Sequence, residues 1–219
     1  MKEMVINKID DFEINGFGSN KSWEKIPWTD LVTIGKASLK YSTRVKLQWS
    51  DKGLYFLFYC EDEKLTCTKT NHFEEIYLED VVEVFLWPDE GQFSYFEYEI
   101  SPLGMELPLL VINNQGSFHG WLPFLYKGNR KIESATQIIG GEKKPMAEAQ
   151  AWIAEFFIPY ELIKGLLNNP PQCGTVWRAN MVRMDYESSP KTQWSWCDDD
   201  ALVDDFHNFN HYGKLIFAE

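Results

Sequence analysis

The sequence predicts an all-β protein, an antiparallel β-sandwich of jelly-roll-like arrangement with one short helix. Many short segments alternate apolar and polar residues with the two-residue period of a strand, and only one segment has helical spacing. Aromatic residues make up 16% of the chain, which is enough to fill a sizeable core. Because β-sandwiches of this length commonly stay undivided, we expect residues 1–219 to form a single domain.

The clearest predicted element is a β-hairpin over residues 43–62. Residues 50–53 read SDKG and supply turn chemistry between two β-rich segments. The second segment, residues 54–60, is apolar on both of its faces. Since such a strand must be covered on both sides, we expect it to lie in the middle of a sheet.

The same alternation predicts further strands. They cover residues 79–87, 94–101, 107–113, 131–139, 147–158, 175–186, 192–197 and 213–218. The predicted helix covers residues 158–169, where Pro159 takes a first-turn position and Leu162, Ile163 and Leu166 follow at helical spacing. Many strands, one helix and no alternation between the two favour a sandwich over an α/β fold.

The charge balance and the lack of a long apolar run exclude several kinds of partner. Asp and Glu number 33 against 21 Lys and Arg, so the net charge is −12, which repels phosphate backbones and anionic lipids. The longest apolar run, residues 107–112, is far shorter than the ~20 residues that span a bilayer. We therefore expect neither nucleic acid nor a membrane as a partner.

The first 16 residues hold no apolar stretch or small-residue cleavage site typical of secretion signals. As the sequence stands, the expected location is the cytoplasm. Removal of a leader would instead indicate an extracellular or periplasmic location.

Acidic residues in two predicted strands raise a functional question. Glu83 shares its strand face with apolar residues, among them Phe85. Glu97 and Glu99 are both candidate partners of Glu83. If the two strands form a hairpin, one register places Glu83 opposite Glu99, with Cβ atoms about 4.5–5.5 Å apart. The carboxyl groups of a retaining glycosidase lie about 5–5.5 Å apart, so an acid pair is one interpretation.

Two other interpretations of these acids stay open. They lie on a solvated sheet face, as in an ordinary antiparallel sheet, which is the interpretation we give Glu97. Alternatively they hold a ligand or a cation, because like charges directly opposite each other destabilise a sheet unless something neutralises them. Arg130, Arg178 and Arg183 are the candidate neutralising side chains.

Aromatic residues outside the predicted strands form a second group of candidates. They are Tyr77, Trp121, Phe206, Phe209 and Tyr212. A pyranose presents an apolar C–H face and a ring of hydroxyls, so flat rings beside carboxylates suit it. Core packing is the competing interpretation for each ring, since large aromatic residues are highly buried on average.

Metal-binding patterns are weak in this sequence. Residues 198–205 hold five Asp, and crowded carboxylates bind Ca²⁺, but the run lacks the spacing and glycine of an EF-hand loop. A solvated acidic loop is the favoured interpretation. The four cysteines show no metal-ligand spacing, and no glycine-rich phosphate loop occurs.

An ordered series of segments carries a family resemblance. It comprises TRVKLQWSDKGLYFLFYCED, LEDVVEVFLWPD, YFEYEISPLG, AWIAEFFIPYELI, GTVWRANMVRMD and WSW…FHNFNHYGKLIF. The series resembles family 9 carbohydrate-binding modules from about Trp23 to Phe217. The resemblance implies a β-sandwich that holds sugars, typically at a chain end, between two aromatic rings. Family members are often attached to xylanases and other glycoside hydrolases, and some carry structural calcium.

The resemblance also implies a set of ligand-binding residues. They are Tyr77, Glu83, Glu99, Trp196, Phe206 and His207. Tyr77 and Phe206 take the positions of the two sandwiching rings, where Trp is usual, and Glu83 takes the position of a sugar-binding Glu. Glu99 stands where some members have a basic residue, and Trp196 and His207 would line the rim.

The leading prediction is a non-catalytic domain that binds a mono- or oligosaccharide, such as a chain end of xylan or cellulose. Two alternatives stay open: a glycoside hydrolase that uses Glu83 and Glu99, and a sandwich scaffold that has lost sugar binding. No cofactor is expected to be required, although the resemblance allows a structural calcium ion. A glycoside hydrolase is the candidate protein partner.

Overall fold

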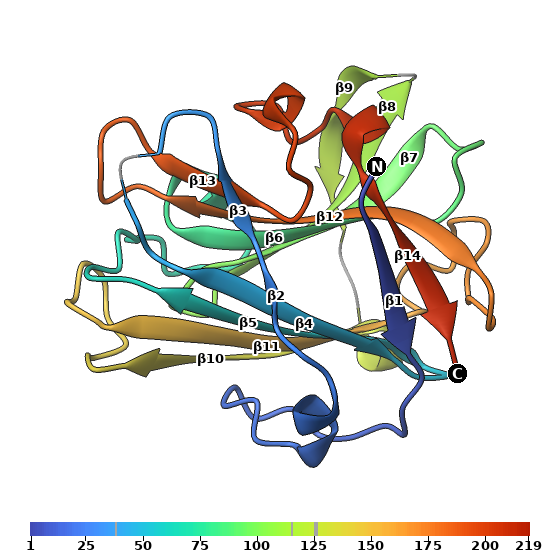
Figure 1. The fold of residues 1–219 in the computed structure, drawn as a ribbon, viewed down its shortest axis with the longest axis horizontal. Helices are drawn as coiled ribbons and strands as arrows, with labels where there is room; N and C mark the ends of the chain where they lie inside the picture. The colour runs from blue at the N-terminus through green and yellow to red at the C-terminus, as the bar shows by residue number, and fades with distance from the viewer. Residues whose placement is uncertain (38, 115, 125–126) are drawn as a thin grey trace.

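Two β-sheets packed face to face form the protein in a computed structural model that describes residues 1–37, 39–114, 116–124 and 127–219 (Figure 1). The larger sheet has nine strands and the smaller sheet has five. The predicted all-β sandwich is therefore confirmed. One strand pair, β1 with β14, is parallel, and the other pairs are antiparallel.

The strand order places β6 and β7 in the middle of the larger sheet, which runs β1-β14-β12-β6-β7-β8-β9, with β13 on β12 and β3 on β13. Its strands are β1 (Glu3–Asn7), β3 (Val32–Ile34), β6 (Val81–Trp87), β7 (Ser94–Ile100), β8 (Glu106–Asn114), β9 (Ser117–Pro123), β12 (Val176–Asp185), β13 (Thr192–Ser195) and β14 (Gly213–Ala218). The smaller sheet runs β10-β11-β5-β4-β2. Its strands are β2 (Thr29–Asp30), β4 (Thr43–Trp49), β5 (Gly53–Glu61), β10 (Glu133–Ile139) and β11 (Ala151–Pro159).

Alternate residues of β6 and β7 fill the space between the sheets. The ring of Tyr98 on β7 lies 4.8 Å from that of Phe156 on β11, measured between centroids. Val84 is the cross-strand partner of Tyr98 and is fully buried with it. Because successive side chains of a strand point to opposite faces, the intervening residues of β6 and β7 point away from the smaller sheet.

The predicted hairpin over residues 43–62 is confirmed as β4 and β5. Its register pairs Trp49 with Leu54 across the SDKG turn. β5 lies between β4 and β11, inside the smaller sheet, and almost all of its residues are buried. Its two apolar faces are therefore covered as expected.

The predicted helix over residues 158–169 is wrong. β11 continues to Pro159, and the chain then runs through successive turns. These turns are closed over three residues, as where the Leu162 N–H donates to the Pro159 carbonyl at 2.9 Å. So short a segment gains few helical hydrogen bonds to offset nucleation, and Gly165 weakens it further.

Helical structure in the described ranges consists of short 3-10 turns. They are η1 (Lys21–Lys25), η2 (Ile76–Leu78), η3 (Gly128–Arg130), η4 (Asp200–Leu202) and η5 (Phe209–His211). Within these ranges no helix has the length and apolar character that a membrane span requires.

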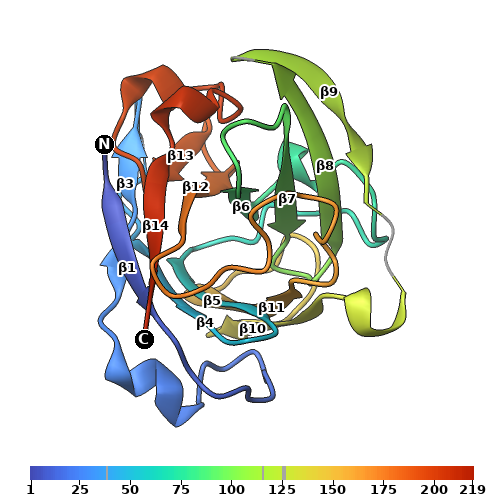
Figure 2. The same ribbon diagram turned by 90° about the vertical axis from the view of Figure 1, so that its right-hand side faces the viewer.

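Strands β1, β2, β3 and β9 lie outside the predicted strands. β9 is largely exposed, so it lacks the apolar alternation that reveals a half-buried strand. In Figure 2, β8 and β9 lie on one side of β6 and β7, and the loop that leads into β14 lies on the other. These two structures flank the face of the sheet that carries the acidic residues.

Candidate functional site

The hairpin β6–β7 brings three acidic side chains to one face of the larger sheet. Its register pairs Glu83 with Glu99, one of the two acid pairings considered from the sequence, and Phe85 with Glu97. Only 4% of Glu83, 3% of Glu97 and 1% of Glu99 is exposed. The interpretation of Glu97 as solvated surface charge is therefore wrong, because flanking segments cover this face.

A pocket of about 210 Å³ lies over these acids. Its lining includes five of the predicted ligand-binding residues, namely Tyr77, Glu83, Glu99, Phe206 and His207. Glu97 and Trp121 line it as well, so the structure adds an acid and an indole to the predicted set. Trp121 was a candidate among the aromatic residues, but its place beside Tyr77 depends on the unpredicted strand β9.

The 3-10 turn η2 presents Tyr77 to the pocket directly before β6. Fully buried Ile76 anchors the turn in the core. The Tyr186 hydroxyl donates to the Tyr77 backbone carbonyl at 2.7 Å. The Tyr77 ring meets Trp121 edge to face, with centroids 6.4 Å apart. Both contacts fix the ring at one wall of the pocket.

Three hydrogen-bonding contacts position Phe206 and His207 at the pocket, in the loop that precedes β14. The Tyr212 hydroxyl donates to the Phe206 carbonyl at 2.7 Å. The Asn113 amide of β8 donates to the His207 carbonyl at 2.8 Å. The Tyr95 hydroxyl of β7 lies 2.6 Å from His207 Nδ1. The loop before β14 is thereby held against β7 and β8.

The acidic run 198–205 contributes to the rim of the pocket rather than forming only a solvated loop. Asp204 and Asp205 are exposed and line the pocket. Gln193 donates to Asp204 Oδ1 at 3.0 Å and accepts from the Asp204 N–H at 3.1 Å. Lys191 Nζ lies 3.3 Å from Asp204 Oδ1. Lys191 and Asp204 therefore form an ion pair at the rim of the pocket.

The environment of the pocket favours uncharged side chains. Burial raises the pKa of Glu83 to about 8. Burial also raises the pKa values of Glu97 and Glu99 well above their ordinary range, and the charge of Glu83 adds to both shifts. Burial lowers the pKa of His207 to about 4, so its imidazole is neutral. At neutral pH the unliganded site therefore retains protons on its buried glutamates, Glu83, Glu97 and Glu99.

The three arginines proposed as neutralising partners are engaged elsewhere, so that expectation is wrong. Arg178 pairs with Glu90 at 3.0 Å. Arg130 donates to the backbone carbonyls of residues 161 and 162. Arg183 belongs to a separate cluster described below. Charge pairing across a fold depends on which strands become neighbours, which spacing along the chain does not reveal.

A family model described as "Carbohydrate family 9 binding domain-like" matches residues 14–219. The chain belongs to this family. The match covers every strand except β1, and every residue of the pocket described above. No curated protein matches the sequence significantly.

Solved structures share the fold of this family 9 domain at low sequence identity. A candidate carbohydrate-binding protein from Bacteroides uniformis ATCC 8492 is 14% identical, with a TM-score of 0.79 and 99% of each chain covered. A family 9 module from Caldicellulosiruptor kristjanssonii in complex with cellotriose is 16% identical, with a TM-score of 0.68 and coverage of 99% of this chain and 94% of that one. The glucose complex of a family 9 module from the same organism is 17% identical, with a TM-score of 0.66 and coverage of 99% and 95%.

The position of Trp196 in this family 9 domain differs from the one predicted. Trp196 is 1% exposed and belongs to the hydrophobic core instead of the pocket lining. Its ring packs so closely on Gly213 that a Cβ there would lie 2.5 Å from it. Placing Trp196 at the rim is therefore wrong, because this residue directly follows β13 and its ring is buried against Gly213 of β14.

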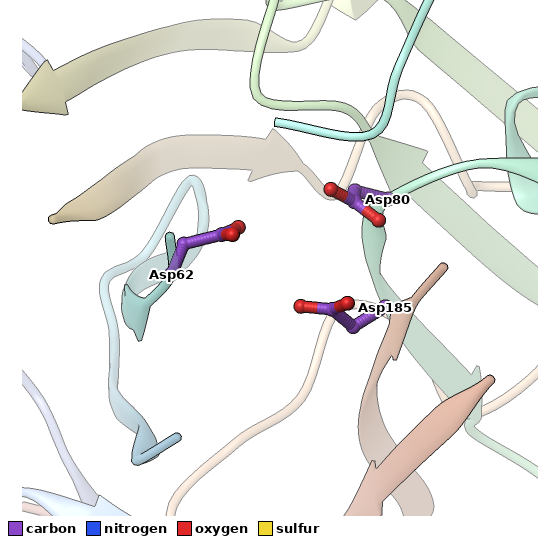
Figure 3. A group of neighbouring side chains, drawn as sticks. All are labelled: Asp62, Asp80 and Asp185. Carbon is purple, nitrogen blue, oxygen red and sulfur yellow. The ribbon is translucent and has the colours of Figure 1, made fainter. Parts of the chain in front are cut away.

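A second acidic cluster, which sequence reasoning missed, lies at one end of the sandwich (Figure 3). Asp62 directly follows β5, Asp80 precedes β6 and Asp185 ends β12, so both sheets contribute. The three carboxylates point toward one another, with ligand-type oxygens within 4.8 Å of each other, and all three residues are buried. Burial raises the pKa of Asp62 to about 7 and that of Asp80 to about 8.

An arginine side chain lies inside this cluster. Arg183 Nη2 lies 3.1 Å from Asp62 Oδ2 and 2.7 Å from Asp185 Oδ2. Its Nη1 donates to the Glu61 carbonyl at 2.6 Å, and its guanidinium lies 4.8 Å from the centroid of the Trp194 ring. The side chain is fully buried, so the ion pairs are shielded from water.

Because structural calcium occurs in some family 9 modules, the cluster is the natural place to test for one. All six carboxylate oxygens already accept hydrogen bonds, two from Arg183 and the others from backbone N–H groups. Ca²⁺ takes 6–8 oxygen ligands, whereas two of the three carboxylates here already pair with the buried positive charge of Arg183. The residues present therefore fit an internal ion pair with Arg183 and do not fit a resident calcium ion.

Proposed function

We propose that this protein binds carbohydrate in the pocket over β6 and β7 without catalysing a reaction on it. The observation that carries the proposal is the pocket itself, in which aromatic rings and buried carboxyl groups line one small cavity. The rings cover the apolar face of a pyranose, and the carboxyl groups hydrogen-bond its hydroxyls. Membership of the family 9 domains supports the same conclusion.

The size of the pocket favours a single sugar ring. Its volume of about 210 Å³ is below the about 300–1,000 Å³ typical of pockets for drug-sized ligands. A terminal residue of an oligosaccharide would fit there with the remaining residues in solvent. Family 9 structures that share the fold were solved with cellotriose and with glucose, which supports the ends of cellulose fragments as ligands. A glycoside hydrolase that generates such ends is the proposed partner.

Hydrolysis by the carboxyl groups is the less favoured function. A retaining glycosidase needs one ionised carboxylate as nucleophile beside one protonated acid. In this pocket burial raises the pKa of Glu83, Glu97 and Glu99 together, which leaves no ionised nucleophile at neutral pH. Release of reducing sugar by the purified protein, abolished by Glu83→Gln, would overturn the binding-only proposal.

Replacing Tyr77 with Ala should weaken sugar binding about tenfold, because the loss of one stacking ring removes about 1–2 kcal/mol. Isothermal titration calorimetry with cellobiose measures this change. Phe17→Ala is the matched control, since Phe17 is 62% exposed and outside the pocket. Unchanged affinity in Tyr77→Ala, with an unchanged urea midpoint, would show that the sugar binds elsewhere.

A further inference from the structure

The buried end of the pocket has an excess of carboxyl groups over cations. Glu83, Glu97 and Glu99 lie together there, each at least nine-tenths buried. Among the described lining residues, the cationic groups are Lys191, already paired with Asp204, and His207. His207 Nδ1 lies 3.8 Å from Glu97 Oε2, but burial lowers the pKa of the imidazole to about 4, so it brings no charge.

Two buried oxygens in this group have no hydrogen-bond partner elsewhere among the described residues, although the Glu97 and Glu99 carboxyl groups hydrogen-bond each other. They are Glu97 Oε2 and Glu99 Oε2. Glu97 is 3% exposed and Glu99 is 1% exposed, so bulk water does not satisfy them. A buried acceptor without a donor costs about 1–3 kcal/mol, which a ligand that supplies the donor recovers. The two oxygens therefore mark where a ligand with N–H or O–H groups would be held.

The aromatic walls suit a cation as well as a sugar face. Tyr77, Trp121 and Phe206 line the pocket, and Phe85 lies 6.3 Å from Phe206 between ring centroids. A cation over such ring faces gains about 0.5–2 kcal/mol. An ammonium group also brings three donors and a positive charge, and hydrogen bonds to ionised groups are roughly twice as strong as neutral ones.

We propose that the pocket prefers sugars that carry a protonated amine, such as a 2-amino-2-deoxy aldose, over the corresponding neutral sugars. The inference rests on the proposed carbohydrate-binding function and specifies its ligand class. The sugar ring lies against the aromatic walls, and the ammonium group donates to Glu97 and Glu99. Glu83 lies directly opposite Glu99 and is the third acidic side chain around the ammonium group.

Binding of the ammonium group is coupled to proton release. In the unliganded pocket burial raises the pKa of all three glutamates, so they hold protons near neutral pH. A bound cation favours the ionised form, and on the order of one proton leaves the site for each ligand bound. The phenols of Tyr77 and Tyr186 also face the pocket, and their raised pKa values keep them protonated throughout. Asp204 and Asp205 at the rim are exposed and do not share this burial.

Calorimetric titration of the full chain with glucose, glucosamine and N-acetylglucosamine tests the proposal at about pH 6.5, where a sugar amine keeps its proton. EDTA is present, so that no metal ion competes for the carboxyl groups. We expect glucosamine to bind about tenfold tighter than the two neutral sugars, a difference of about 1.4 kcal/mol. Repeating each titration in two buffers of different ionisation enthalpy should reveal proton release with glucosamine alone.

Isosteric variants connect this preference to the buried acids. Glu97→Gln and, independently, Glu99→Gln should weaken binding of glucosamine by a larger factor than binding of glucose, so that the ratio of the two affinities falls toward one. Glu133→Gln makes the same substitution at the exposed first residue of β10, outside the pocket, and it should keep the preference. Urea midpoints identify any variant that is unfolded.

Four outcomes are decisive. Glucose and glucosamine of equal affinity would overturn this inference and leave the proposed function intact, as would a preference that survives both glutamine variants. Failure of all three sugars and of cellobiose to bind would overturn both. A preference for glucosamine that is lost in Glu97→Gln and retained in Glu133→Gln would establish it.

Discussion

Replacing Arg183 with Met should destabilise the folded protein by about 3–5 kcal/mol, because it leaves buried carboxylates without their cation. Arg183 is fully buried and forms ion pairs with both Asp62 and Asp185. Its removal also breaks the hydrogen bonds that Arg183 donates to the Glu61 carbonyl and the Thr43 hydroxyl. Methionine fills part of the volume but supplies neither charge nor hydrogen bonds.

Urea unfolding followed by tryptophan fluorescence measures the effect of Arg183→Met. Arg183→Lys is the matched control, because it keeps the charge and loses the fork of donors, so it should fall between wild type and Arg183→Met. EDTA should leave the wild-type midpoint unchanged, whereas added calcium should stabilise Arg183→Met, whose three aspartates lack a counter-charge. A wild-type midpoint that falls in EDTA would show that a metal ion shares the cluster with Arg183.

The unliganded protein should become less stable as the pH rises from about 5.5 to about 8.5, by at least about 2 kcal/mol. Burial raises the folded-state pKa of Glu83 and Asp80 to about 8 and that of Asp62 to about 7. In the unfolded chain these groups titrate near pH 4. Between the two values the folded state binds more protons, so raising the pH favours unfolding. Glu97 and Glu99 act in the same direction.

Urea midpoints across this pH range test the prediction. Glu97→Gln should flatten the dependence, since a neutral isostere removes one titrating group and relieves repulsion with its neighbours. Glu133→Gln, exposed on β10, should keep the wild-type slope. Saturating glucosamine should also reduce the slope, because a bound cation stabilises the ionised acids. Stability that increases with pH would mean that the buried acids are ionised in the free protein.

Much of the architecture could be predicted because the signals are local. The SDKG turn and the alternation on either side of it fix β4 and β5, and their register was found as expected. The pairing of Glu83 with Glu99 is one of the registers that the two-residue period allows, and the structure adopts it. The family resemblance added Tyr77 and Phe206, which the structure brings into one pocket. The helical spacing at residues 158–169 led to the wrong prediction of a helix, because an apolar period of this length also fits a series of turns.

The sequence by itself determined which residues alternate, where the chain turns, and hence that this is a β-sandwich with acids on one strand face. Only the tertiary structure decided which faces are covered: it buried Glu97 and Trp196, and it placed Lys191 beside Asp204. It also assembled Asp62, Asp80 and Asp185 from the ends of three strands in two sheets. Alternation depends on the geometry of a single strand, whereas burial and charge pairing depend on segments far apart in the chain, whose approach is set by packing of the whole core.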